Sequence, residues 1–85
     1  MHYVYVLQGE EYKDYLYVGN TGNLTIRLAN HNSGGNYSTR KYKPFRIVYY
    51  EAYLNKQDAL DREIKLKHHG SVIGHFKRRI RRSLA

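Results

Sequence analysis

Two short runs of alternating tyrosine and aliphatic residues constrain the fold of this chain most strongly. The first is Tyr-Val-Tyr-Val-Leu over residues 3–7, and the second is Tyr-Leu-Tyr-Val-Gly over residues 15–19. A period of two with aromatic and β-branched residues is typical of β-strands, and the seven residues between the runs are mostly polar. The pattern predicts an antiparallel β-hairpin, with Tyr5 on one face of the sheet and Val4 and Val6 on the other.

The remaining sequence predicts one more strand and three helices. Their ranges are 23–32 for the first helix, 45–53 for the third strand, 56–69 for the second helix and about 72–83 for a basic C-terminal helix. We expect Gly19 to turn the chain after the second strand and Gly70 to end the second helix. Thr21 or Asn23 is expected to cap the N-terminus of the first helix. The expected order is β-β-α-β-α-α. It gives an α+β fold with a small three-stranded, mainly antiparallel sheet flanked by helices, in a single domain over residues 1–85.

An excess of positive charge narrows the choice of partner. Lysine and arginine number 15 against 7 carboxylates, so the formal net charge is +8. No carboxylate lies between Tyr15 and Tyr50, and none follows Glu63. Such a surface suits a polyanion, most simply a nucleic acid, with anionic lipid and ribosomal RNA as the competing partners.

Several classes of protein are excluded or disfavoured by what the sequence lacks. The chain has no cysteine, which excludes disulfides, thiolate metal sites and a cysteine nucleophile, and which is compatible with a reducing cytoplasm. No apolar run approaches the ~20 residues that span a bilayer, and the N-terminus lacks signal-peptide features. We therefore expect a cytoplasmic protein with no membrane partner. There is no P-loop, dinucleotide fingerprint or serine elbow, and His68, His69 and His75 lack zinc-site spacing.

Two polar residues stand out on the first predicted helix. Arg27 and His31 are four apart, so they project from the same helix face beside Leu24 and Leu28. One interpretation is structural: Arg27 extends its charge to solvent or pairs with a carboxylate, and His31 lies near a helix end. The other is that both side chains contact one ligand.

Glu63 lies among the inward positions of the second predicted helix. These positions are expected to be Ala59, Leu60 and Ile64. A carboxylate directed toward the edge of a core is costly unless it is paired or binds a metal. An ion pair with Lys67 would contribute only about 0.2–0.5 kcal/mol. The functional interpretation makes Glu63 a ligand of Mg²⁺ or Mn²⁺, which take one or two protein carboxylates and keep several waters.

Tyrosine is abundant, at ten of the 85 residues, and most of these side chains are expected to fill the sheet. Tyr5 and Tyr17 differ because they lie on adjacent predicted strands, close to the strand ends. The pKa of a phenol is ordinarily about 10, so a tyrosine that acts as a base needs neighbouring positive charge. Arg27 is the candidate source of that charge.

The C-terminal segment combines a basic surface with a narrow apolar stripe. Phe76 and Ile80 are four residues apart and can dock the helix on the rest of the protein. The cations that would contact phosphate groups are Lys77, Arg78, Arg79, Arg81 and Arg82. Docking and phosphate contact are compatible, and we expect both.

Together these segments resemble the GIY-YIG nuclease superfamily, specifically its small single-domain members, and they are similar to the nuclease domain of the excinuclease C subunit. The matching segments, in chain order, are residues 3–5 and 17–19 for the two signatures, 23–34 for the arginine helix, 37–53 leading into and through the third strand, and 57–67 for the glutamate helix. The likeness covers roughly residues 3–69 in one order, which makes it far more specific than any single motif.

The resemblance implies a divalent-metal-dependent phosphodiesterase. It implies that Tyr5 and Tyr17 flank the scissile phosphate and that one phenol, most often the second-signature one (Tyr17 here), helps to deprotonate the attacking water. Arg27 would neutralise charge on the phosphate, and His31 would contact the phosphate or assist proton transfer. Glu63 would hold one Mg²⁺ or Mn²⁺ ion, which polarises the phosphoryl oxygen and stabilises the leaving oxygen.

Three positions depart from the family pattern. Tyr3 replaces the glycine of the first signature, Asn20 stands where some relatives have a lysine, and Ile26 replaces the first of two frequent arginines. The loop that follows the first helix supplies cations that could compensate and that we expect to bind nucleic acid, namely Arg40, Lys41 and Lys43.

The sequence thus leads to two main hypotheses. The first is a metal-dependent endonuclease that cleaves DNA, with specificity set by substrate structure, a protein partner or a homodimer. The second is a non-catalytic nucleic-acid-binding module that keeps the nuclease fold, which the departure at Asn20 and the basic tail favour. An RNA-associated structural protein is a third, weaker interpretation.

Overall fold

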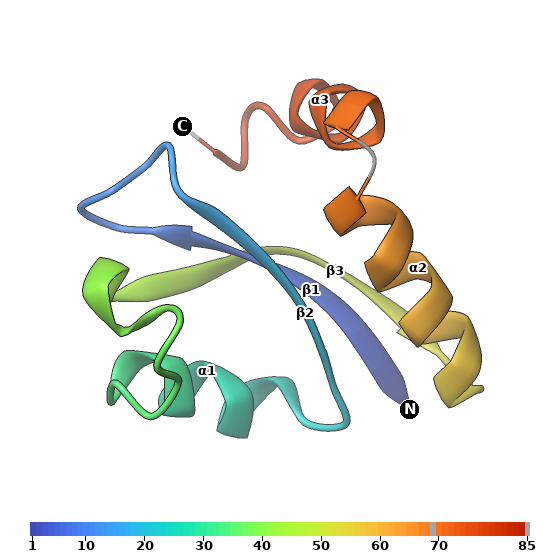
Figure 1. Ribbon diagram of the computed structural model, residues 1–85, viewed down its shortest axis with the longest axis horizontal. Helices are drawn as coiled ribbons and strands as arrows, with labels where there is room; N and C mark the ends of the chain where they lie inside the picture. The colour runs from blue at the N-terminus through green and yellow to red at the C-terminus, as the bar shows by residue number, and fades with distance from the viewer. Residues whose placement is uncertain (69, 85) are drawn as a thin grey trace.

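Three antiparallel strands form one sheet, and helices cover both of its faces (Figure 1). The computed structural model describes residues 1–68 and 70–84. Its elements are β1 (His2–Gly9), β2 (Leu16–Thr21), α1 (Leu24–Asn32), the 3₁₀ helix η1 (Arg40–Tyr42), β3 (Phe45–Tyr53), α2 (Lys56–His68) and α3 (Gly70–Arg79). The predicted α+β fold and the order β-β-α-β-α-α are confirmed, and η1 is an addition within the basic loop.

The strand order is β2-β1-β3, so β1 is central and β2 lies at an edge of the sheet. β1 pairs antiparallel with both neighbours, and Tyr5 lies opposite Gly19 on β2 and Tyr50 on β3. As expected for a central strand, β1 is buried from Val4 to Gly9. One long edge of β2 has no strand beside it, so side chains from both faces of the sheet can meet there.

Alternate residues of β1 belong to two separate hydrophobic clusters. On one face, the buried cluster consists of Val4, Val6, Val18, Ala59, Leu66 and Phe76. On the other face, Tyr5, Leu7 and Phe45 are buried and pack with Tyr17, Leu24 and Leu28. α1 therefore covers the tyrosine face, while α2 and α3 cover the valine face, and Figure 1 shows these helices on opposite sides of the strands. The predicted division of the first strand between two faces is correct.

Gly19 does not turn the chain, and that prediction was wrong. β2 continues through Gly19 to Thr21, and the side chain of Asn23 then caps α1 by accepting a hydrogen bond from the Ile26 backbone N–H at 3.0 Å. A Cβ atom on Gly19 would lie 2.5 Å from the hydroxyl oxygen of Tyr5 and 2.6 Å from its Cζ. The missing side chain therefore makes room for the phenol that crosses from the neighbouring strand.

The inward face of α2 also differs from the prediction. Ile64 is 53% exposed, whereas Leu66 is only 1% exposed and packs beside Ala59. The helix is oriented by Ala59, which is small enough to lie against the sheet, and by an ion pair at 3.0 Å between Arg62 and Glu51 of β3. These contacts turn Ile64 toward solvent, a rotation that the apolar pattern of the helix does not specify.

The C-terminal helix begins at Gly70 and ends at Arg79, earlier than predicted. The residues after it bond to the sheet instead: the Gln8 amide donates to the Leu84 carbonyl at 2.9 Å, and Arg46 donates to the Ser83 carbonyl at 2.8 Å. These contacts draw the chain away from the helix axis. His69, the predicted end of the second helix, lies outside the described residues. In the described part of the chain, no helix combines the length and apolar character that crossing a membrane requires.

We expect Gly19→Ala to destabilise the protein by about 1–3 kcal/mol, because the added methyl group must displace the Tyr5 phenol. Gly22→Ala is the matched control, since a Cβ there meets no atom within 4 Å. Its effect should stay within about 0.5 kcal/mol. The measurement is the free energy of unfolding in urea. Equal effects at the two glycines would contradict the packing of Tyr5 on Gly19.

The rotation of α2 predicts a second difference in stability. Leu66→Ala should lower the free energy of unfolding by about 2–5 kcal/mol, because it leaves a cavity beneath the helix. Ile64→Ala removes an exposed side chain from the same helix and should change stability by no more than about 0.5 kcal/mol. Thermal or urea unfolding of both variants tests this, and a larger cost at Ile64 would mean that the helix is rotated differently.

Candidate active site at the free edge of β2

The tyrosine face of the sheet contains a chain of buried hydrogen bonds. The hydroxyl oxygen of Tyr5 lies 2.9 Å from Nε2 of His31, and Nδ1 of His31 lies 2.8 Å from Oγ1 of Thr39. Tyr5 is 1% exposed, and His31 and Thr39 are both 0% exposed. His31 therefore faces the interior and is a fixed partner of the phenol, although it belongs to the last turn of α1.

Both ends of α1 are anchored, which fixes the position of His31. Asn23 caps the first turn, and the side chain of Asn32 bonds to the backbone of Phe45. In the second contact the amide of Asn32 donates to the Phe45 carbonyl at 3.1 Å and accepts from the Phe45 N–H at 2.6 Å. Since Leu24 and Leu28 pack inward, the helix face they share turns toward the sheet, as the sequence predicted.

Tyr17 lies beside this buried chain but closer to solvent. Its ring centroid is 6.3 Å from that of Tyr5 and 5.2 Å from that of His31. Tyr5 is buried in the central strand, whereas Tyr17 is only partly buried in the edge strand. Of the two phenols named from the sequence, Tyr17 is therefore the one that a substrate or a water molecule can reach more easily.

Arg27 interacts with the hydroxyl of Tyr5 and is not paired with a carboxylate among the described residues. Burial raises the pKa of Tyr5 above its ordinary value, nearby Tyr17 raises it further, and the charge and hydrogen-bonding interaction of Arg27 oppose both effects without outweighing them. Arg27 thus lowers the pKa of Tyr5, as expected of a neighbouring positive charge, but burial outweighs it and the net shift is upward. No carboxylate is ion-paired with Arg27 within residues 1–68 and 70–84.

The histidine of the buried chain is neutral at ordinary pH. Burial lowers the pKa of His31 below its usual value, and the positive charge of Arg27 lowers it further. A neutral imidazole has one nitrogen that donates and one that accepts a hydrogen bond. His31 can therefore accept a hydrogen bond from the hydroxyl of Tyr5.

Glu63 reaches the same region from the opposite face of the sheet. One carboxylate oxygen accepts a hydrogen bond from the Asn20 amide at 2.8 Å, and the other lies 3.2 Å from the Lys67 ammonium. That ammonium also lies 5.3 Å from the ring centroid of Tyr17. The negative charge of Glu63 contributes to the raised pKa of Tyr5. The contacts therefore run around the free edge of β2 and join the two faces.

Glu63 is the carboxylate of this region that a single hard cation could use, by taking the place of one of its present partners. Its side chain is 14% exposed, and a positive charge, the Lys67 ammonium, already lies beside it. Mg²⁺ is often held through one carboxylate and completes its shell with water and substrate oxygens. The described residues contain no group of three or more His, Cys, Asp or Glu side chains that could enclose a metal. The ion pair with Lys67, which was the structural interpretation of Glu63, is present as well.

A cavity of about 400 Å³ lies along β2 beside Tyr17. Its lining includes Tyr17, the two cations Lys67 and Lys77, and the carboxylate of Asp14. A neighbouring cavity of about 330 Å³ shares Lys77 and Asp14 and adds Lys13. Together the cavities lead from the accessible phenol along the strand edge, with lysines from α2 and α3 beside them.

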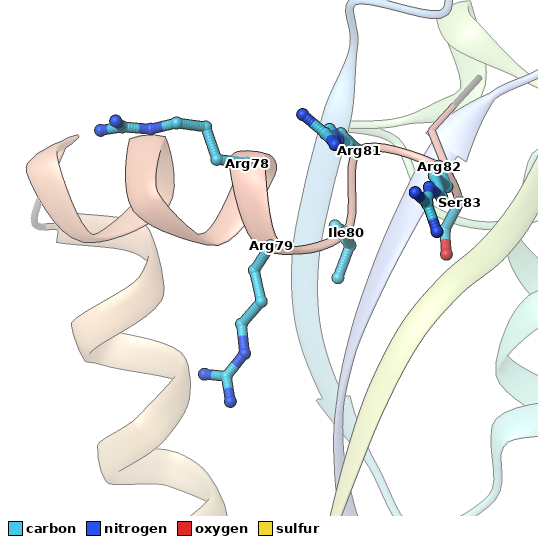
Figure 2. Close-up of a pocket in the computed structure, with 6 residues that line it drawn as sticks. All are labelled: Arg78, Arg79, Ile80, Arg81, Arg82 and Ser83. Carbon is cyan, nitrogen blue, oxygen red and sulfur yellow. The ribbon is translucent and has the colours of Figure 1, made fainter.

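The cations proposed to bind nucleic acid do not form one cluster. The loop group, Arg40, Lys41 and Lys43, is exposed and follows α1, whereas Lys77 and the four arginines lie in or just after α3. Figure 1 places η1 and α3 at opposite sides of the molecule. A cavity of about 360 Å³ is lined by Arg78, Arg79, Arg81 and Arg82, among others. Figure 2 shows the side chains of these four arginines pointing in different directions. Such divergent guanidinium groups suit an extended polyanion better than one small anion.

Three residues near the site were missed or given another role from the sequence. Thr39 was not considered because it lies in a Gly-rich basic loop, where a buried threonine has no recognisable pattern. Asn20 was treated only as a missing cation, yet it holds Glu63. Lys67 was considered only as an ion-pair partner, and its position four residues after Glu63 was the available signal.

Comparison with known proteins agrees with this geometry. The family model of the GIY-YIG catalytic domain matches residues 1–72. A UPF0213 protein of Oceanobacillus iheyensis is 39% identical over 67 residues, covering 78% of this chain and 76% of the relative. A UPF0213 protein of Clostridium perfringens is 41% identical over 68 residues, covering 79% of this chain and 71% of the relative.

A solved structure is similar as well. The solution NMR structure of a UPF0213 protein from Bacillus halodurans is 33% identical, with a TM-score of 0.52, and the match covers 87% of this chain and 78% of that one. The family model spans both signatures, the arginine helix and the glutamate helix. This chain therefore belongs to the GIY-YIG nuclease family, among relatives that are small UPF0213 proteins.

Proposed function

We propose that this protein is a divalent-metal-dependent endonuclease that hydrolyses phosphodiester bonds in DNA, acting as one domain over residues 1–85. The observation that carries the proposal is the gathering of two phenols, a cation, a neutral histidine and a carboxylate at the free edge of β2. Phosphoryl transfer depends mainly on positioning and on electrostatic stabilisation, and this set of groups can provide both. A chain without cysteine also suits the reducing cytoplasm, where we place its action.

Each side chain has a distinct part in this proposal. Tyr17, the more accessible phenol, orients the attacking water and helps to remove its proton. Arg27, which lies beside the Tyr5 hydroxyl, contacts the phosphate, and its guanidinium neutralises charge that develops on the phosphoryl oxygens. His31 accepts the hydrogen bond of Tyr5 and so fixes the direction of the Tyr5 hydroxyl beside Arg27. Glu63 would hold the Mg²⁺ or Mn²⁺ ion, which when bound supplies Lewis-acid stabilisation of the phosphoryl and leaving oxygens.

The lysines beside Tyr17 support a path for the nucleic acid along β2. Lys67 and Lys77 line the cavity next to the phenol, so a strand whose phosphate lies at Tyr17 can extend toward both. The loop cations and the tail arginines would add weaker contacts farther along an extended backbone. Specificity set by substrate structure, a protein partner or a homodimer remains part of the proposal.

A non-catalytic nucleic-acid-binding module is the alternative, and the internal contacts of Glu63 favour it. Both carboxylate oxygens already have partners, Asn20 and Lys67, so the charge is balanced without a metal. A binding module would show salt-sensitive affinity for nucleic acid and no cleavage at any concentration of divalent cation.

We expect Glu63→Gln to reduce nicking of plasmid or branched DNA in Mg²⁺ or Mn²⁺ by at least about a hundredfold, since the loss of the metal contribution costs several kcal/mol. Chelation with EDTA should have the same effect on the wild type. Asp61→Asn, an exposed change on the same helix, is the control and should retain activity. Equal nicking by wild type and Glu63→Gln would indicate a contaminating nuclease and refute the proposal.

The path along β2 predicts that lysines differ in their contribution to binding. Lys77→Ala should reduce the slope of log affinity against log salt concentration by about 0.9, because one phosphate contact is lost. Lys56→Ala, an exposed change at the start of α2, removes the same charge outside the two cavities that flank β2 and should leave the slope nearly unchanged. Fluorescence anisotropy with a labelled duplex over a salt series measures both. An equal decrease in slope for both variants would show that affinity depends only on the net charge and would contradict a path along β2.

A further inference from the structure

Thr39 is fully buried although it belongs to a polar, basic loop. It is 0% exposed, and its hydroxyl lies 2.8 Å from Nδ1 of His31. The same hydroxyl donates to the backbone carbonyl of Asn36 at 3.5 Å, and that carbonyl also accepts the backbone N–H groups of Thr39 and Arg40. The loop thus presents one oxygen atom to the side of His31 that is remote from Tyr5.

The ends of this hydrogen-bond chain determine its direction. The Tyr5 hydroxyl needs His31 as its acceptor, and at the other end the Asn36 carbonyl, 3.5 Å away, can accept the hydroxyl proton of Thr39. The Thr39 oxygen then accepts from the Nδ1–H of His31, which leaves Nε2 without a proton. Nε2 accordingly accepts the hydrogen bond of the Tyr5 hydroxyl at 2.9 Å. Burial and Arg27 lower the pKa of His31, which favours the neutral ring, and the two hydrogen bonds then select the tautomer.

The opposite tautomer would give Tyr5 the opposite role. With a proton on Nε2, His31 would donate to the Tyr5 oxygen, and the hydroxyl proton of Tyr5 would need another acceptor. Within the described residues, the hydrogen bonds of this hydroxyl include no second acceptor, and Arg27, which interacts with it, can only donate. The tautomer therefore decides whether Tyr5 turns a proton or its lone pairs toward the site.

We propose that Thr39 is a positioning residue that fixes His31 as its Nδ1–H tautomer, so that Nε2 holds the hydroxyl proton of Tyr5 and the Tyr5 oxygen presents lone pairs to Arg27 and the site. The part of this inference that concerns cleavage rests on the proposed nuclease function. The part that concerns the tautomer does not, because it describes the protein without substrate.

The first experiment measures the tautomer directly in the full chain. Two-bond ¹H–¹⁵N correlation spectra of ¹⁵N-labelled protein distinguish a protonated from an unprotonated ring nitrogen, at a pH above the ordinary histidine pKa of about 6.5. Wild type and Thr39→Ser should both show the Nδ1–H form of His31. Thr39→Val, which is similar in shape but lacks the oxygen, should lose that form in favour of Nε2–H or a mixture.

Either of two results would overturn the inference: an Nε2–H histidine in the wild type, or an unchanged Nδ1–H histidine in a folded Thr39→Val. If Thr39→Val does not fold, the wild-type and Thr39→Ser spectra still decide the point. In the nicking assay, Thr39→Val should reduce kcat by about a hundredfold with little change in KM, and Thr39→Ser should restore most of the activity. A wild type with the expected tautomer and no nicking would refute the nuclease proposal while leaving the role of Thr39 in place.

Discussion

The contact between Tyr5 and Gly19 is the constraint on which the rest of the site depends. The two residues face each other across the β1–β2 pair, and the phenol occupies the space that a side chain at Gly19 would fill. This contact places the hydroxyl of Tyr5 over the edge strand and within 2.9 Å of His31. A larger residue at position 19 would move the phenol and break the hydrogen-bond chain behind it. The glycine of the second signature thus has a packing role and not a turning one.

The edge position of β2 explains how two faces of one sheet contribute to one site. Side chains on opposite faces of a central strand are separated by the sheet, but at an edge they can meet around it. α1 brings Arg27 and His31 to the tyrosine face, and α2 brings Glu63 and Lys67 to the valine face. The Lys67 ammonium, which lies near both the Tyr17 ring and the Glu63 carboxylate, is the contact that joins them.

Much of the fold followed from local patterns, and the errors have identifiable causes. The alternation of valine and tyrosine correctly divided β1 between two cores, and Asn23 was correctly named as a candidate cap. The predicted inward face of α2 was wrong because the ion pair between Arg62 and Glu51, which are eleven residues apart in the sequence, orients the helix. The end of α3 was misplaced because the carbonyls of Ser83 and Leu84, which follow the helix, accept hydrogen bonds from Arg46 and Gln8, in distant parts of the chain. Non-local contacts of this kind leave no periodic trace in the sequence.

By itself, the sequence determined the order of the strands and α-helices, the faces taken by residues of β1 and β2, and the family that the motifs resemble, because these depend on spacing over a few residues. Tertiary structure alone decided that Tyr5 is buried with a raised pKa, that Thr39 lies behind His31, and that Asn20 holds Glu63. The physical reason is that hydrogen-bond direction, desolvation and charge pairing depend on distances between groups far apart in the chain. Those distances exist only after the sheet and both helical layers have packed.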